Sequence, residues 1–329
     1  MSSGPSVAVI GGTGFVGLNI SDAFLTDFRT SFSRVRILTR DAGTPKAQGL
    51  AYKGAELFQV DEDDVHSSLD AAFADIDVIV NTLPTTVSDR LNHDVLRAVA
   101  RSGAKVYFLS EFMADHRHLS SPGFGFEPAE WQRRRALARE ARRSFRGKVI
   151  ALYTSLFFEL AMAHPVLGFD IANNEFTAYG SPAQRVSFTS LRDIGRAVAR
   201  LAILSAAPPA HAPAPARADG STGEAAAAVP DDVRIAGATV TFEDVRDIVA
   251  RVRGVAPARI RTADLRAKRA MLGIPGVPLH EYIRVAMAEG KLDLGEANDN
   301  ELVNPGGSLW TWRSVEDFVR GQFPTRRNE

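Results

Sequence analysis

A glycine-rich turn between a strand-like run and a helical pattern constrains the fold of this chain most. The apolar residues 7–10 (VAVI) are followed by GGTGFVG at 11–17 and by a helical pattern through Ile20 and Phe24. Glycines in this spacing permit a tight turn and let a pyrophosphate approach the helix N-terminus, where backbone N–H groups hold its charge. The order strand, turn, helix predicts a dinucleotide-binding turn; the alternative is a plain strand-to-helix turn.

The alternation of strand-like and helical segments continues to about residue 155. Apolar runs predict further strands at 35–38, 56–60, 78–80, 105–109 and 149–153, with helices between them. This alternation is typical of a doubly wound α/β fold, in which a parallel Rossmann sheet with right-handed crossovers carries helices on both faces.

The regular alternation weakens in the second half of the chain. We therefore predict an NAD(P)-binding Rossmann domain at 1–155 and a smaller mixed α/β substrate lobe at 156–329, with segments that return to the first domain. Residues 205–230 are mostly Ala and Pro, which predicts a disordered surface loop. The chain then continues with a strand and two helices, expected at 233–235, 242–253 and 280–288.

Composition excludes several classes of function. With 39 basic and 39 acidic residues the net charge is zero, so neither nucleic acid nor a membrane is expected as a partner. The chain has no cysteine, which excludes disulfides, thiolate catalysis and zinc–sulfur sites, and no metal site is predicted. Because neither a secretion signal nor a membrane-spanning apolar run is found, we expect a cytoplasmic protein, or a nuclear one if it is a regulator.

The end of the second strand indicates which dinucleotide is bound. Proteins that prefer NAD usually place an acid there to hold the ribose hydroxyls, whereas this chain has Thr39 and Arg40, with Lys46 shortly after. A hydroxyl and two cations suit a 2′-phosphate, which predicts NADP(H). NAD(H) is the alternative, because Asp41 could contact the ribose instead.

Several segments carry a family resemblance. Residues 11–17, 38–40, 81–84 (NTLP) and 109–112 (LSEF) together resemble the NmrA-like family of atypical short-chain dehydrogenases/reductases, which includes isoflavone reductase-like enzymes. Two later segments look like those of fungal members, at 188–195 and 298–305. The likeness covers most of the chain except the Ala/Pro-rich loop.

The resemblance implies a set of cofactor-binding residues. The pyrophosphate would lie against the turn residues Gly11, Thr13, Gly14, Phe15, Val16 and Gly17. Arg40 and Lys46 would hold the 2′-phosphate. The adenosine and ribose would lie beside Thr82, Leu83 and Pro84, and the nicotinamide near Ser110, Glu111 and Phe112. A strand end closed by proline is the alternative interpretation of 81–84.

The catalytic lysine of the resembled reductases is missing. The matching residue is Arg134 when counted from Trp131, or Arg135 when counted back from Tyr153. Arginine stays protonated and cannot readily act as a general acid, but it can bind an anionic or carbonyl oxygen. A solvated basic helix face is the alternative role for these arginines.

Other acid–base groups are few. None of the five tyrosines has a lysine four residues later, so the Tyr-x-x-x-Lys pair of typical short-chain dehydrogenases is absent. Ser110 is expected to hydrogen-bond the reacting oxygen. His116 and His118 could supply acid–base chemistry, although two histidines in a polar loop are more often solvated.

The substrate pocket is expected after the sixth strand, where family members line it. The residues there are Ser155, Leu156, Phe157 and Phe158, which would favour a hydrophobic substrate, with aromatic compounds as one candidate class. Core packing explains the two phenylalanines equally well. Trp310 and Trp312 could share one face of a short strand and pack there.

The sequence thus predicts an NADP(H)-dependent oxidoreductase, acting as a reductase on a hydrophobic small molecule through an atypical active site. The alternative is a non-catalytic redox-sensing regulator of the NmrA type, which binds NAD(P) and reports its redox state to a protein partner.

Overall fold

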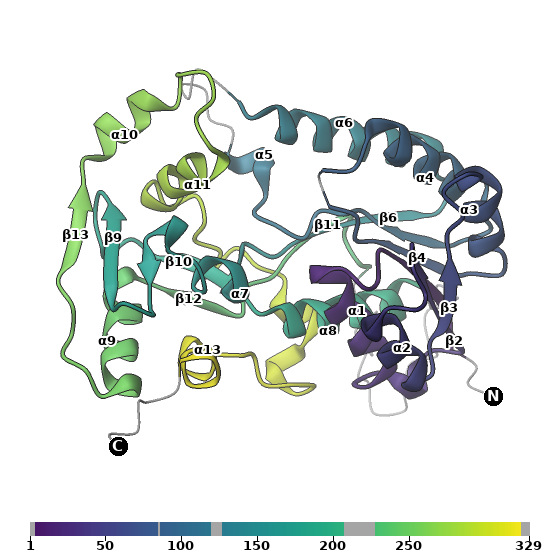
Figure 1. Cartoon of the computed structure of the whole chain (residues 1–329), viewed down its shortest axis with the longest axis horizontal. Helices are drawn as coiled ribbons and strands as arrows, with labels where there is room; N and C mark the ends of the chain where they lie inside the picture. The colour runs from purple at the N-terminus through teal and green to yellow at the C-terminus, as the bar shows by residue number, and fades with distance from the viewer. Residues whose placement is uncertain (1–3, 85, 120–126, 207–227, 324–329) are drawn as a thin grey trace, which may run out of the picture.

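The computed structural model describes residues 4–84, 86–119, 127–206 and 228–323. Its centre is a parallel seven-stranded sheet in the order β11-β6-β5-β4-β1-β2-β3 (Figure 1). The strands are β1 (Ser6–Ile10), β2 (Arg34–Thr39), β3 (Glu56–Gln59), β4 (Val78–Asn81), β5 (Val106–Phe108), β6 (Lys148–Tyr153) and β11 (Asp232–Arg234). This sheet confirms the expected doubly wound Rossmann fold.

Helices cover both faces of the sheet, since alternate strand residues point to opposite sides. In β1, Val7 and Val9 pack toward α1 (Phe15–Leu25), α2 (Pro45–Tyr52) and α8 (Leu191–Ala206), which lie together on one face in Figure 1. Ala8 and Ile10 pack toward the helices of the other face, α3 (Val65–Phe73), α4 (Asp89–Arg101) and α6 (Ala129–Ser144). The carboxyl ends of β1, β4 and β5 therefore meet at one edge.

The smaller lobe has two three-stranded sheets. Their strands are β7 (Leu156–Phe157), β10 (Val186–Thr189) and β12 (Ala238–Val240), then β8 (Phe169–Asp170), β9 (Glu175–Tyr179) and β13 (Ile260–Ala263). The helices near them are α5 (His116–Leu119), α7 (Phe158–Ala161), α9 (Phe242–Arg253), α10 (Leu265–Met271), α11 (Leu279–Ala288) and α13 (Val315–Gln322). The short helix α12 (Asn300–Val303) packs instead on α8 of the first sheet. Short 3-10 turns lie at Arg29–Ser31, Pro165–Leu167 and Pro305–Gly307. Stacked rings form the core of this lobe, with Phe158 against both Phe188 and Phe318.

Two expectations need correction at the junction of the lobes. The disordered loop expected at 205–230 is wrong for its described ends, because Ser205 and Ala206 are the last residues of α8 and Val229 is buried. Residues 207–227 lie outside the described residues. Trp310 and Trp312 pack edge to face with ring centroids 5.3 Å apart, as the packing role predicts, but residues 310–312 form no strand with any described part of the chain. In the described parts of the chain, no helix is both long and apolar enough to cross a membrane.

Candidate functional site

The glycine turn is closed tightly against the end of β4. Gly11 has a φ of +72°, which favours glycine, and a Cβ on Gly17 would lie 2.2 Å from the Gly11 carbonyl oxygen and 2.5 Å from Thr82 Oγ1. Thr82 Oγ1 in turn donates to the Ile10 carbonyl at 2.6 Å. Backbone and side chains thus leave no room for a larger residue at 17, and the turn and Thr82 form one unit.

Within the described chain, no side chain pairs with the backbone N–H groups at the start of the helix that follows the turn. No side chain caps α1 at Gly14, and its first turn contains no acidic residue. N–H groups at an uncapped helix start carry partial positive charge and bind anions. The exposed ring of Phe15 lies 6.3 Å from the ring of Phe157, so the turn reaches the segment that follows β6. Thr13 and Val16 lie in the same turn.

The residues after β2 also lie at this edge. Thr39 is buried, with its Oγ1 3.4 Å from Thr13 Oγ1, whereas Arg40 and Lys46 are exposed and have no ion pair among the described residues. The carboxylate of Asp41 accepts from the Gly43 N–H at 2.7 Å. Asp41 is therefore engaged in a local turn, and two unpaired cations remain available to an anionic group.

Arg134 and Ser110 meet at the end of β5. Arg134 Nη1 donates to the Ser110 carbonyl and lies 3.5 Å from Glu111 Oε2, while its Nε donates to Glu130 at 3.3 Å. Arg135 instead forms an ion pair with Glu127. One residue along a helix turns a side chain by about 100°, so only one of these arginines can reach Ser110.

The hydroxyl of Ser110 is already used as a donor. Its Oγ donates to the Leu83 carbonyl at 2.7 Å, which links the ends of β4 and β5. A serine hydroxyl has one proton to donate and two lone pairs that accept. In this arrangement the Ser110 Oγ can accept a hydrogen bond from a ligand. It can donate to a reacting oxygen only after its hydrogen bond to the Leu83 carbonyl breaks.

A cavity of about 50 Å³ lies beneath these residues, between α4 and α6. Five of the predicted site residues line it, namely Leu83, Pro84, Ser110, Glu111 and Arg134. Sequence reasoning missed the polar residues Asn81, Asn92, Tyr107 and Arg133 of its lining. Asn81 Nδ2 donates to the Tyr107 hydroxyl at 3.1 Å, and burial raises the pKa of Tyr107 to about 12 despite this bond.

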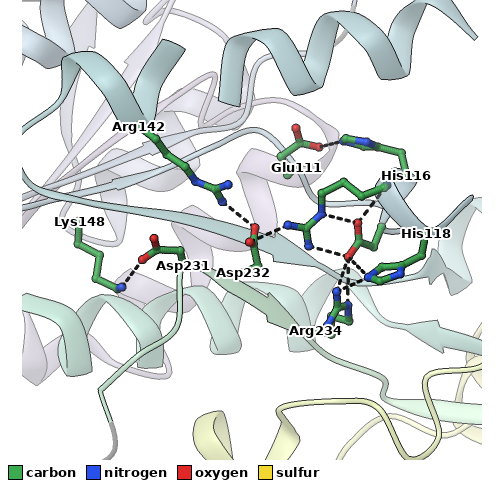
Figure 2. Close-up of polar contacts among 10 residues, drawn as sticks. Glu111, His116, His118, Arg142, Lys148, Asp231, Asp232 and Arg234 are labelled. Atoms are coloured by element: carbon green, nitrogen blue, oxygen red, sulfur yellow. Dashed lines mark hydrogen bonds and ion pairs between the residues drawn. The ribbon is translucent and has the colours of Figure 1, made fainter. Parts of the chain in front are cut away.

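His116 lies in the interior rather than in a solvated loop. It begins the one-turn helix α5, its side chain is 1% exposed, and its Nε2 lies 3.1 Å from Oε2 of Glu111, which is 3% exposed (Figure 2). His118, two residues on, is 64% exposed. Glu111 therefore lies between a guanidinium and an imidazole, next to Ser110.

Asp115 anchors this loop to the edge strand β11. Its carboxylate accepts from Arg117 at 2.7 and 2.8 Å and from Arg234, which Figure 2 labels, at 2.8 and 3.0 Å. Burial alone would raise the pKa of Asp115, but the hydrogen bonds from the two arginines outweigh it and lower that pKa to about 2. Arg117 also pairs with Asp232, which extends the network to Arg142 of α6.

We expect Asp115→Asn to destabilise the protein by about 2 kcal/mol at pH 7, because the pKa falls from 3.8 in the unfolded chain to about 2 in the folded one. A lowered carboxyl pKa stabilises the fold above pH 4 and stops doing so as the pH falls toward 2. Urea unfolding at pH 7 and at pH 3 measures this, with the exposed Asp63→Asn as control. An unchanged pH dependence in Asp115→Asn would contradict the assignment.

Of the predicted pocket residues after β6, some pack in the core of the smaller lobe and others lie at the carboxyl edge of the main sheet. Phe158 is fully buried between two other rings, so it packs the core of the smaller lobe, and Leu156 is also buried there. Ser155 has a φ of +54°, unusual for a residue other than glycine, and is 2% exposed. Phe157 is half-buried and faces the glycine turn through Phe15.

Phe112, expected near the nicotinamide, is buried in the core between the sheet and α8.

These features define a Rossmann-type α/β protein with a smaller second lobe beside the carboxyl edge of the sheet. The sequence model of the NmrA-like family matches residues 4–203, and the chain belongs to this family. The predicted likeness to fungal members in particular stays a prediction.

One curated relative and several solved structures are similar. Phenylcoumaran benzylic ether reductase PT1 of Pinus taeda is 30% identical over 147 residues, which are 43% of this chain and 47% of that protein, so the match spans about half of it. AtPrR2 with NADP⁺ and (+)-pinoresinol has a TM-score of 0.69 at 16% identity, covering 97% of this chain and 99% of that one. Leucoanthocyanidin reductase of Vitis vinifera with NADPH has a TM-score of 0.67 at 15% identity, covering 96% and 99%. At these identities the structures share the fold.

Proposed function

We propose that this protein is an NADP(H)-dependent reductase of a hydrophobic, aromatic small molecule. The observation that carries the proposal is the arrangement of the sheet edge. An uncapped glycine turn, two cations after β2 that pair with none of the described residues, and the Ser110–Arg134 pair after β5 all lie along it. The named relative is a reductase, and two structures of the same fold hold NADP⁺ or NADPH, which supports this assignment.

Each segment of the edge has a distinct role in this proposal. The glycine turn would bind the pyrophosphate, and Arg40 with Lys46 would hold the 2′-phosphate. Thr82, Leu83 and Pro84 would lie beside the adenosine and ribose, which leaves the end of β5 for the nicotinamide. The bound dinucleotide supplies the hydride chemistry, and the residues of this chain orient the reactants and exclude water.

Proton transfer needs a group other than Arg134. A guanidinium stays charged, so Arg134 would contribute fixed positive charge beside the reacting group. The buried Glu111–His116 pair lies next to Ser110 and is the candidate for holding a proton there. Solvent is the other source, since no tyrosine–lysine pair is present in the sequence.

A redox-sensing regulator is the second candidate. What favours it is the engagement of Arg134 with the Ser110 carbonyl and with two carboxylates, which suits a fixed structural element better than a proton donor. A sensor must bind the two redox states of the dinucleotide with different affinity, because only that difference can shift a partner equilibrium.

Titration calorimetry with NADPH, NADP⁺, NADH and NAD⁺, followed by NADPH oxidation with a panel of aromatic carbonyl compounds, tests both candidates. We expect NADPH to bind more tightly than NADH and at least one panel member to be reduced. Binding that separates NADP⁺ from NADPH without any turnover would favour the regulator. If no dinucleotide binds, both candidates are wrong.

A further inference from the structure

Ser155 combines two unfavourable features at the carboxyl edge of the sheet. The first is its backbone, because a φ of +54° lies in the left-handed region, which is strained for a residue with a Cβ and unstrained for glycine. Two other described residues besides glycine have a positive φ, Asp75 and Asn174, but both lie in turns and are of types that tolerate it. Ser155 instead lies between β6 and β7 and is 2% exposed.

The second feature is the hydroxyl group of Ser155. Its Oγ is buried and forms no hydrogen bond with any of the described residues. A buried hydroxyl without a partner destabilises a fold, because it has given up its hydrogen bonds to water. Glycine at 155 would avoid both the strain and the unpaired hydroxyl. Backbone strain of this kind is typical of ligand-binding sites, and a ligand would supply the missing hydrogen-bond partner.

The surrounding contacts prevent this segment from relaxing. The Thr154 N–H donates to the Met113 carbonyl at 3.0 Å, and the Thr154 carbonyl accepts from Thr189 Oγ1 at 2.8 Å. On the other side of Ser155, β7 pairs with β10. Ser155 is thus fixed from both sides, so its strained conformation persists in the free chain.

The segment that holds Ser155 runs between the two ends of the proposed nicotinamide site. Thr154 is bonded to Met113 in the loop after β5, and the Phe157 ring meets that of Phe15 at the glycine turn after β1. The nicotinamide is proposed at the end of β5 and the pyrophosphate at the glycine turn. The nicotinamide half of the dinucleotide would therefore lie along this segment, with Ser155 at its middle.

We propose that the Ser155 hydroxyl binds the carboxamide of the nicotinamide, which assigns this residue to the cofactor rather than to the substrate. A carboxamide has a carbonyl that accepts and an amino group that donates, and a serine hydroxyl can pair with either. The hydroxyl can turn among three staggered positions about the Cα–Cβ bond, so it can reach a ligand group that arrives beside it.

This contact would help to fix which face of the nicotinamide ring is turned to the substrate. The inference rests on the proposed function, because it requires that a nicotinamide dinucleotide binds along the sheet edge. It goes further in one respect, since it makes a residue of the segment after β6 responsible for recognising the nicotinamide itself.

Titration calorimetry with NADP⁺ and with 2′-phospho-ADP-ribose, which is the same molecule without the nicotinamide, tests the proposal. We expect Ser155→Ala to weaken NADP⁺ binding by about 3- to 10-fold, the usual contribution of one hydrogen bond. Binding of 2′-phospho-ADP-ribose should change by less than about twofold, because it has no carboxamide to lose. Ser155→Gly should show the same pattern of affinities.

Thermal unfolding of the free proteins separates this role from a structural one. Ser155→Ala removes a buried hydroxyl that has no described partner, so the variant should unfold at no lower temperature than the parent. Ser155→Gly also removes the strain and should unfold at a higher temperature than Ser155→Ala. A lower unfolding temperature of free Ser155→Ala would show that the hydroxyl is satisfied within the protein, and would overturn the proposal.

The control is Ser205→Ala, which removes another buried hydroxyl without a partner among the described residues. Ser205 lies in the last turn of α8, about 20 Å along the helix from the end next to Thr189, and its loss should leave both affinities unchanged. Equal losses for the two ligands in Ser155→Ala, or no loss for either, would overturn the role of Ser155 and leave the proposed function intact. A parent protein that binds neither ligand would refute the proposed function and this inference together.

Discussion

Replacing Arg40 with Ala weakens NADPH binding by about 10- to 100-fold, because a charged hydrogen bond to a phosphate contributes about 1.5–3 kcal/mol. NADH binding should change by less than about twofold, since NADH has no 2′-phosphate for a second-strand cation to hold. Arg40 is exposed and has no described partner, so the variant should unfold at the same temperature as the parent.

Calorimetric titration of the Arg40 variant with both reduced dinucleotides measures this ratio. Arg146→Ala is the matched control, because Arg146 is an exposed arginine just before β6, a strand separated from β2 by three others, and has no described partner. An equal loss of NADPH and NADH affinity in the Arg40 variant would mean that Arg40 does not contact the 2′-phosphate. Asp41 would then become the candidate for the ribose.

Replacing Gly17 with Ala should destabilise the protein by about 3 kcal/mol and abolish dinucleotide binding. The new Cβ would lie 2.2 Å from the Gly11 carbonyl oxygen and 2.9 Å from Gly12 Cα, and backbone cannot rotate away as a flexible side chain can. The Thr82 hydroxyl, 2.5 Å away, is itself bonded to Ile10. Relief of the clash must therefore widen the turn that is proposed to hold the pyrophosphate.

Thermal unfolding and calorimetric titration of the Gly17 variant measure both effects. Gly49→Ala is the control, because Gly49 lies within α2 with no atom within 4 Å of its added Cβ. Alanine there should stabilise the helix by about 0.5–1 kcal/mol and leave binding unchanged. A Gly17 variant that binds NADPH like the parent would exclude the turn from the cofactor site.

The strands and several helices could be predicted because local patterns specify them. Buried parallel strands are continuous apolar runs, as in β1 and β4. The helix expected at 242–253 has the bounds of α9 because it begins at a capping box of Thr241 with Asp244 and ends at Gly254 in the left-handed region. Such signals act within a few residues.

The site could be predicted only where it depends on one segment. Whether Arg134 or Arg135 reaches Ser110 depends on the rotation of α6 against the sheet, and residue counts from the two ends disagree by one position. The burial of His116 depends on Glu111 five residues earlier and on the lobe above it. Asn92 joins the cavity through the packing of α4 on α6, which no local pattern specifies.

The return of the chain to its first sheet has a consequence for synthesis on the ribosome. β6 pairs with β11, and α8 packs on α1, so both the sheet edge and the outer face of α1 are covered by segments made much later. Until those segments emerge, the nascent first half exposes an unpaired strand edge and apolar side chains, features that promote wrong association. The seven-stranded sheet can therefore be completed only after β11 has been synthesised.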